Sequence, residues 1–216
     1  MIKRITLILL SFFYIINAQI ALPTFQAVHT HHPCSGTSTL EVRVATDYDD
    51  AEENKNQGMY LNSSDLELAY AGSSVGSQQI GMRFLNIIIP QGTEITNTYL
   101  RFTADETHSN SCSLTIYGED VDDAEQFTSS SGNISGRPKT SASVDWTPDP
   151  WTSVGTEYDS PDLLTITQEI VNRSGWSSGN DMVFIVTGTG TGRRVADSAK
   201  NSSSTAPLVH IEYCTP

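Results

Sequence analysis

The chain has 216 residues and a formal net charge of −13. Such a length is compatible with a single β-sandwich domain. A strongly acidic surface repels the phosphates of nucleic acids and the head groups of anionic membranes, so we expect neither nucleic acid nor a membrane as a partner.

The N-terminus has the layout of a secretory signal peptide. Lys3 and Arg4 precede an apolar run from Ile5 to Ile16, and the small residue Ala18 follows it. The run is shorter than the roughly 20 residues that a membrane-spanning helix needs, so we expect no membrane insertion. We predict a signal peptide over residues 1–18, with cleavage after Ala21 as the alternative, and a secreted, extracellular protein. Loss of the two cations would change the formal charge from −13 to −15.

The remainder is predicted to be a leader segment over residues 19–38 and one β-sandwich over residues 39–216. Short runs of alternating apolar and polar residues, separated by residues typical of turns, indicate half-buried strands. These runs lie at 40–44, 64–70, 80–84, 87–90, 93–103, 112–118, 144–146, 181–187 and 206–213. The pattern predicts an all-β fold, an antiparallel two-sheet jelly-roll β-sandwich.

One helix is predicted at about residues 161–173. Ser160 is placed as its N-cap and Pro161 at the first helical position. Apolar residues then recur at helical spacing, and we expect that stripe to pack over one end of the sandwich.

Three cysteines, Cys34, Cys112 and Cys214, allow three single disulfides, each leaving one thiol over. A secreted protein permits such bonds. We favour Cys34 with Cys214, because they flank the domain and the termini of a jelly roll usually lie side by side. Cys112 is then expected to be buried and unpaired.

Several segments together resemble one type of module. They are DDAEE at Asp49–Glu53, SSDLEL at Ser63–Leu68, MRFLNIIIPQGTEITNTYLRF from Met82, QEIVNRSGWSSGN from Gln168 and APLVHIEY from Ala206. The chain is similar here to the DNRLRE-like and carbohydrate-binding-module-like β-sandwiches of secreted bacterial proteins, over roughly Leu40 to Tyr213. The resemblance implies a jelly roll in an extracellular setting that is often linked to polysaccharides.

The densest set of hard oxygen ligands runs from Asp47 to Glu53. Calcium takes six to eight oxygens, often from one local loop and a distant residue. In an extended chain alternate side chains face opposite sides, so Asp49 and Glu53 would share one side, and Asp50 and Glu52 the other. We predict a structural calcium site, which the resemblance also implies, with the ligands Asp49, Asp50, Glu52, Glu53 and Asp65. A solvated acidic loop is the alternative.

Ligand contacts are predicted at two places. Trp146 and Trp151 lie in a proline-rich loop and could stack on sugar rings, although tryptophans in long loops often pack inward instead. Arg193 and Arg194 follow a glycine-rich run, predicted to be a loop, and could bind an anionic sugar. An ion pair with Asp197 or the acidic cluster is the alternative for them.

We therefore expect a secreted, non-catalytic binding module, carbohydrate-binding or adhesive, with a polysaccharide or glycan as partner and calcium as a structural cofactor. No nucleophile elbow or zinc-protease motif is present in the sequence. Two alternatives remain open: a structural surface or matrix protein acting through protein contacts, and a polysaccharide-degrading lyase or hydrolase.

Overall fold

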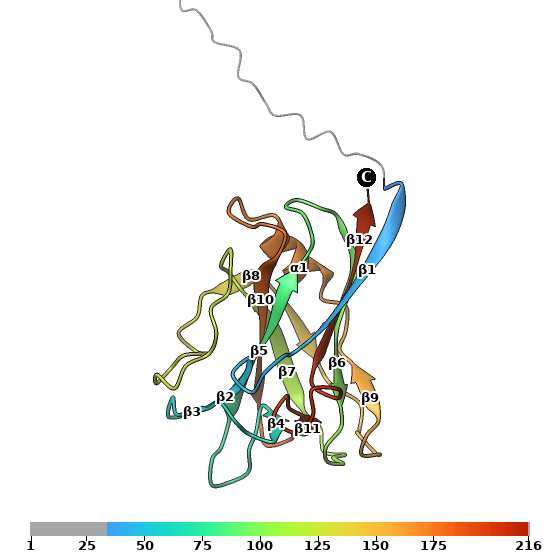
Figure 1. Ribbon diagram of the computed structural model, residues 1–216. Coiled ribbons are helices and arrows are strands. Elements are labelled where there is room, and N and C mark those ends of the chain that lie inside the picture. The colour runs from blue at the N-terminus through green and yellow to red at the C-terminus, as the bar shows by residue number, and fades with distance from the viewer. Residues whose placement is uncertain (1–33, 216) are drawn as a thin grey trace, which may run out of the picture. The chain divides into compact units, whose positions relative to one another are not determined.

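The computed structural model describes residues 34–215, drawn in colour in Figure 1. The predicted signal peptide and residues 19–33 of the predicted leader lie outside the described residues. In chain order the elements are β1 (Gly36–Arg43), β2 (Asp50–Asn54), β3 (Met59–Tyr60), β4 (Asp65–Leu68), β5 (Gln78–Ile87), β6 (Ile95–Thr103), β7 (Ser113–Glu119), β8 (Lys139–Trp146), β9 (Glu157–Asp159), α1 (Leu164–Val171), β10 (Asn180–Thr189), β11 (Arg194–Asp197) and β12 (Leu208–Thr215).

The strands form a sandwich of two antiparallel sheets (Figure 1). One sheet has four strands in the order β1-β12-β6-β9, and the other has six in the order β3-β2-β5-β10-β7-β8. Consecutive strands β5, β6 and β7 alternate between the sheets, as the chain does in a jelly roll. The predicted all-β sandwich is confirmed, and its first strand begins at Gly36, three residues before the predicted start of the domain.

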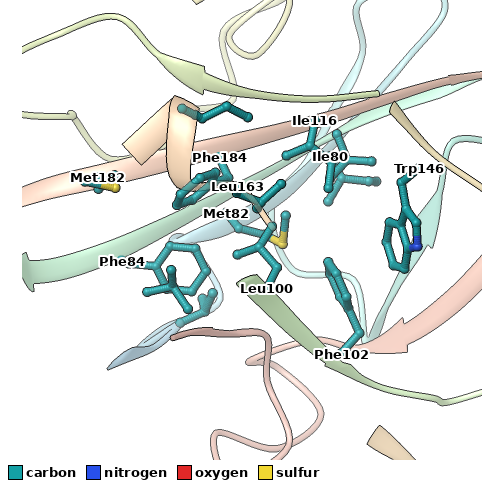
Figure 2. Packing of buried hydrophobic residues seen from close by; sticks show 14 of the residues in the cluster. Ile80, Met82, Phe84, Leu100, Phe102, Ile116, Trp146, Leu163, Met182 and Phe184 are labelled. Carbon is teal, nitrogen blue, oxygen red and sulfur yellow. The ribbon is translucent and has the colours of Figure 1, made fainter. Parts of the chain in front are cut away.

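Alternation within the strands builds the core between the sheets. Every second side chain of β5, β7 and β10 points inward, and the opposing β6 contributes Leu100 and Phe102. Figure 2 shows Phe84 and Phe184 side by side in this interior, where their rings meet edge to face with centroids 6.1 Å apart. The small sheet of β4 and β11 buries Leu66, Leu68 and Ala196 in the same core.

Helix α1 is shorter than predicted. It begins at Leu164, and Ser160 is not its N-cap, because the serine hydroxyl accepts a hydrogen bond from the Leu100 N–H instead. The Ser160 N–H donates to the Leu100 carbonyl, which continues the pairing of β9 with β6 and keeps the chain extended there. Ile166 and Ile170 are buried, as the predicted apolar stripe requires, and Gly118 on β7 leaves room for both.

Cys34 and Cys214 form a disulfide across β1 and β12, and Cys112 is buried and free, so both predictions are confirmed. The two strands pair along their whole length, from Gly36 opposite Thr215 to Arg43 opposite Leu208. No helix within residues 34–215 has the length and apolar character required to span a membrane.

Candidate functional site: a polar groove on the six-stranded sheet

The outer face of the six-stranded sheet is half covered. A small second core joins Ala51, Val183 and Ile185 on the sheet to Phe127 and Ile134 above it. These last two belong to the segment over residues 120–138, which connects β7 to β8. The segment buries this half of the sheet face and leaves the other half exposed to solvent.

Close approach and buried hydrogen bonds hold the covering segment in place. Gly81 on β5 is necessary under it, because a Cβ atom there would lie 2.4 Å from Cζ of Phe127. The carboxylate of Glu53 on β2 accepts hydrogen bonds from the backbone N–H groups of Ile134 and Ser135, at 2.7 Å each. The segment is therefore a fixed border to the open half.

A row of polar side chains crosses the open half. Asp145 on β8 lies opposite Thr115 on β7, and Thr115 lies opposite Thr187 on β10. The register of β10 with β5 pairs Val186 with Ile80, and one residue further it places Gln79 beside Thr187. We call Asp145, Thr115, Thr187 and Gln79 the polar row. It crosses four strands at right angles to their direction, a span of about 14 Å at ~4.8 Å per strand.

Two adjoining hollows follow the polar row. The first has a volume of about 340 Å³ and its polar lining includes Ser113, Thr115, Asp145, Thr187 and Thr189. The second, of about 220 Å³, is lined by Glu53, Asn54, Lys55, Ser77, Gln78, Gln79, Thr187 and Gly188. Both include Thr187 and Gly188, so together they form one shallow channel, which we call the polar groove.

Much of the hydrogen-bonding capacity of the polar groove is unused. Thr115 donates to a carboxylate oxygen of Asp145 at 2.9 Å, and Thr187 donates to the Thr115 carbonyl at 3.3 Å. Within residues 34–215, no side-chain hydrogen bond engages Ser113, Thr189 or Gln79. These hydroxyl and amide groups can both donate and accept, so they can bind a ligand without breaking contacts of the protein.

Trp146 and Trp151 do not form an exposed platform, and this prediction is wrong. Their relative exposures are 7% and 1%, and both rings lie against Phe102 in the core. Figure 2 shows Trp146 and Phe102 facing each other. Trp151 also stacks on Tyr158, with centroids 4.9 Å apart. The alternative interpretation, that the tryptophans fasten the loop to the sandwich, is correct. Trp146 touches the polar groove only as part of the wall of the first hollow.

The two predicted anion-binding arginines are already engaged. Arg194 is 1% exposed and donates hydrogen bonds to four backbone carbonyls, those of Asn110, Pro148, Asp149 and Arg193. The prediction that it binds an anionic sugar is therefore wrong, because the side chain is buried and four of its five N–H donors are engaged by backbone carbonyls. Arg193 forms an ion pair with Glu106 at 3.0 Å and approaches Glu67 at 3.8 Å. It is thus ion-paired, although with other carboxylates than Asp197 or the acidic stretch named in the alternative.

The acidic stretch forms no shared metal site. Asp50, Glu52 and Glu53 belong to the buried strand β2, and the expected alternation holds, so the side chains point to opposite sides. Asp49 pairs with Arg83 at 2.8 Å, and Asp50 accepts a hydrogen bond from the Ala199 N–H. Each carboxylate is thus satisfied separately, and the predicted calcium ligands do not converge.

Glu52 lies inside the sandwich beside a second carboxyl group. One of its oxygens accepts hydrogen bonds from the Glu67 N–H at 2.9 Å and from the Gln78 amide at 2.8 Å. The same Gln78 amide nitrogen lies 3.2 Å from the Glu67 carboxylate. Burial, together with the Glu67 side chain, raises the pKa of Glu52 to about 9. Glu52 therefore keeps its proton at neutral pH.

Asp65 belongs to a different group of acids. Carboxylate oxygens of Asp65, Asp105 and Glu106 lie within 4.8 Å of one another, which is close enough to hold a cation. Burial raises the pKa of both Asp65 and Asp105, and nearby carboxylates, chiefly those of Glu67 and Asp197 respectively, add to the effect. Of the five predicted calcium ligands, Asp65 alone is part of this group.

Sequence reasoning missed the polar groove, although one signal was present. Thr115 and Thr187 occupy the polar positions of alternating strands, and such positions face away from the core. No protein-family model and no curated protein matches the chain. Its resemblance to DNRLRE-like modules therefore stays a prediction.

Proposed function

We propose that this chain is a secreted, non-catalytic binding module that binds a glycan in the polar groove. The free hydroxyl and amide groups of Ser113, Thr189 and Gln79 support the proposal most directly. Sugars present rows of hydroxyl groups that both donate and accept, and side chains of this kind match them. The predicted signal peptide and the confirmed disulfide support an extracellular setting.

Glycan-array screening and affinity electrophoresis on the chain without residues 1–18 test the proposal. The double variant Thr189→Val with Gln79→Ala removes two polar groups whose side chains make no hydrogen bond within the described chain. Two lost hydrogen bonds of about 1 kcal/mol each weaken binding by roughly thirtyfold. Thr39→Val is the control for the threonine change, because Thr39 is exposed, as Thr189 is, but lies on β1 in the other sheet.

Other outcomes would favour the alternative functions. Self-association in light scattering without glycan binding would favour a matrix protein. Release of reducing or unsaturated ends from polysaccharides would indicate an enzyme. An unchanged affinity of the Thr189 and Gln79 double variant would place the glycan elsewhere on the molecule.

A structural calcium remains part of the proposal, at Asp65 with Asp105 and Glu106 in place of the other four predicted ligands. Calcium binds through carboxylate oxygens, and an ion that binds only the folded state raises the melting temperature. Melting with calcium and with chelator tests it, and the Asp105→Asn variant should lose the difference. Equal melting temperatures of the wild-type chain under both conditions would refute it.

A further inference from the structure

The arginines within residues 34–215 are all engaged by other groups of the protein. Six arginines form ion pairs with carboxylates: Arg43, Arg83, Arg101, Arg137, Arg173 and Arg193. The seventh, Arg194, has only backbone carbonyls as hydrogen-bond acceptors and is buried. No arginine of residues 34–215 lines the polar groove.

The polar groove itself carries no excess of positive charge. Its charged lining residues are Asp145 in the first hollow, and Glu53 and Lys55 in the second. Lys55 lies at the far end from Asp145, separated by the strands β7, β10 and β5. The first hollow therefore contains a carboxylate and no cation, on a chain whose formal charge is −13.

From this charge distribution we infer that the polar groove discriminates against anionic glycans and takes a glycan without carboxylate groups, an inference that rests on the proposed glycan site. A polymer of uronic acids brings one carboxylate per sugar into a groove with Asp145 at one end and one lysine at the other. Like charges 4 Å apart repel by about 1 kcal/mol in water, and by more where protein displaces water. Neutral sugar hydroxyls have no such cost and pair with Ser113, Thr187 and Thr189.

The experiment compares three polymers of matched length with the chain lacking residues 1–18: a neutral glucan series, a polyuronate and a polyglucosamine. We expect binding to a neutral polymer with an affinity that changes by less than about twofold between 0.05 and 0.5 M NaCl, because salt screens charge and not hydrogen bonds. We expect the polyuronate to bind more weakly than the neutral polymer at 0.05 M NaCl, by about fivefold for one such contact, and the difference to shrink at 0.5 M NaCl because salt screens the repulsion.

Asp145→Lys places a cation in the first hollow and should strengthen polyuronate binding, by a gain that shrinks as salt increases. Asp149→Lys is its control: Asp149 is exposed and absent from the lining of both hollows, so this variant changes the net charge equally and should give no such gain.

Two further results separate this inference from the function on which it rests. Preferential binding of the polyuronate over the neutral polymer by the wild-type chain would overturn the selectivity while leaving the glycan site intact. Failure of every polymer to bind would overturn the glycan site and the selectivity together.

Discussion

The buried carboxyl group of Glu52 offers a sharp test of the structure. Glu52 is 3% exposed, and its pKa is raised to about 9 from an ordinary value of 4.5. Between these two pH values the folded chain holds a proton that the unfolded chain has released. The free energy of unfolding therefore falls as the pH rises through this window. Keeping the group protonated at pH 7 costs about 3 kcal/mol, at ~1.36 kcal/mol per pH unit.

Glu52→Gln should remove that cost. The amide oxygen still accepts from the Glu67 N–H and from Gln78, and the amide nitrogen can donate to the Glu67 carboxylate. For a domain of this size 1 kcal/mol corresponds to about 2–4 °C, so the melting temperature at pH 7 should rise by about 6–12 °C. At pH 4.5 the variant and the wild-type chain should melt within about 2 °C of each other.

Calorimetric melting of both proteins between pH 4.5 and pH 8 measures the effect. Glu53→Gln is the control, because Glu53 is equally buried but accepts two backbone hydrogen bonds as a carboxylate. It should lower stability at pH 7 by about 1–3 kcal/mol. If Glu52→Gln lowered the melting temperature at every pH, Glu52 would not be protonated in the folded chain at neutral pH.

The remaining predictions concern the disulfide, the core and the covering segment. Reduction of Cys34–Cys214, which closes a loop of 180 residues, should lower stability by about 5 kcal/mol by the chain-entropy estimate, and an unchanged melting temperature in reductant would contradict this. Trp151→Ala should lower the free energy of unfolding by about 3–5 kcal/mol, measured by chemical denaturation, and leave the glycan affinity of the folded protein unchanged. Loss of that affinity would show that Trp151 takes part in glycan binding. Gly81→Ala should displace Phe127, cost about 1–3 kcal/mol and speed hydrogen exchange over residues 120–138, and unaltered exchange there would show that the segment does not depend on this contact.

Alternating strands were predictable because their pattern follows directly from one buried and one exposed face. β6, β7 and β12 lie where the sequence places them. The disulfide was predictable because the first and last strands of a jelly roll usually lie side by side, which brings Cys34 next to Cys214. β2 was not recognised as a strand, because an acidic run indicates a solvated loop unless each carboxylate has a buried partner. Those partners are distant in the sequence: Ala199 lies 149 residues after Asp50, and Ile134 lies 81 residues after Glu53.

The candidate site was harder to predict than the fold. Tryptophan and arginine are the residue types that sequence reasoning favours for sugar contacts. Here the tryptophans pack in the core, and Arg194 donates its hydrogen bonds to backbone carbonyls. The polar row consists of ordinary threonine, glutamine and aspartate side chains from four strands. Only the sheet order β5-β10-β7-β8 brings them together, and that order is a property of long-range pairing.

The disulfide also has a mechanical consequence. Cys34 and Cys214 stand at the outer ends of the first and last strands, so tension applied to the chain before Cys34 and after Cys214 runs through the sulfur–sulfur bond. The sequence between them carries none of that load. A module held in this way under flow or shear keeps its sheets, and with them the polar groove, at forces that would separate strands joined by hydrogen bonds alone.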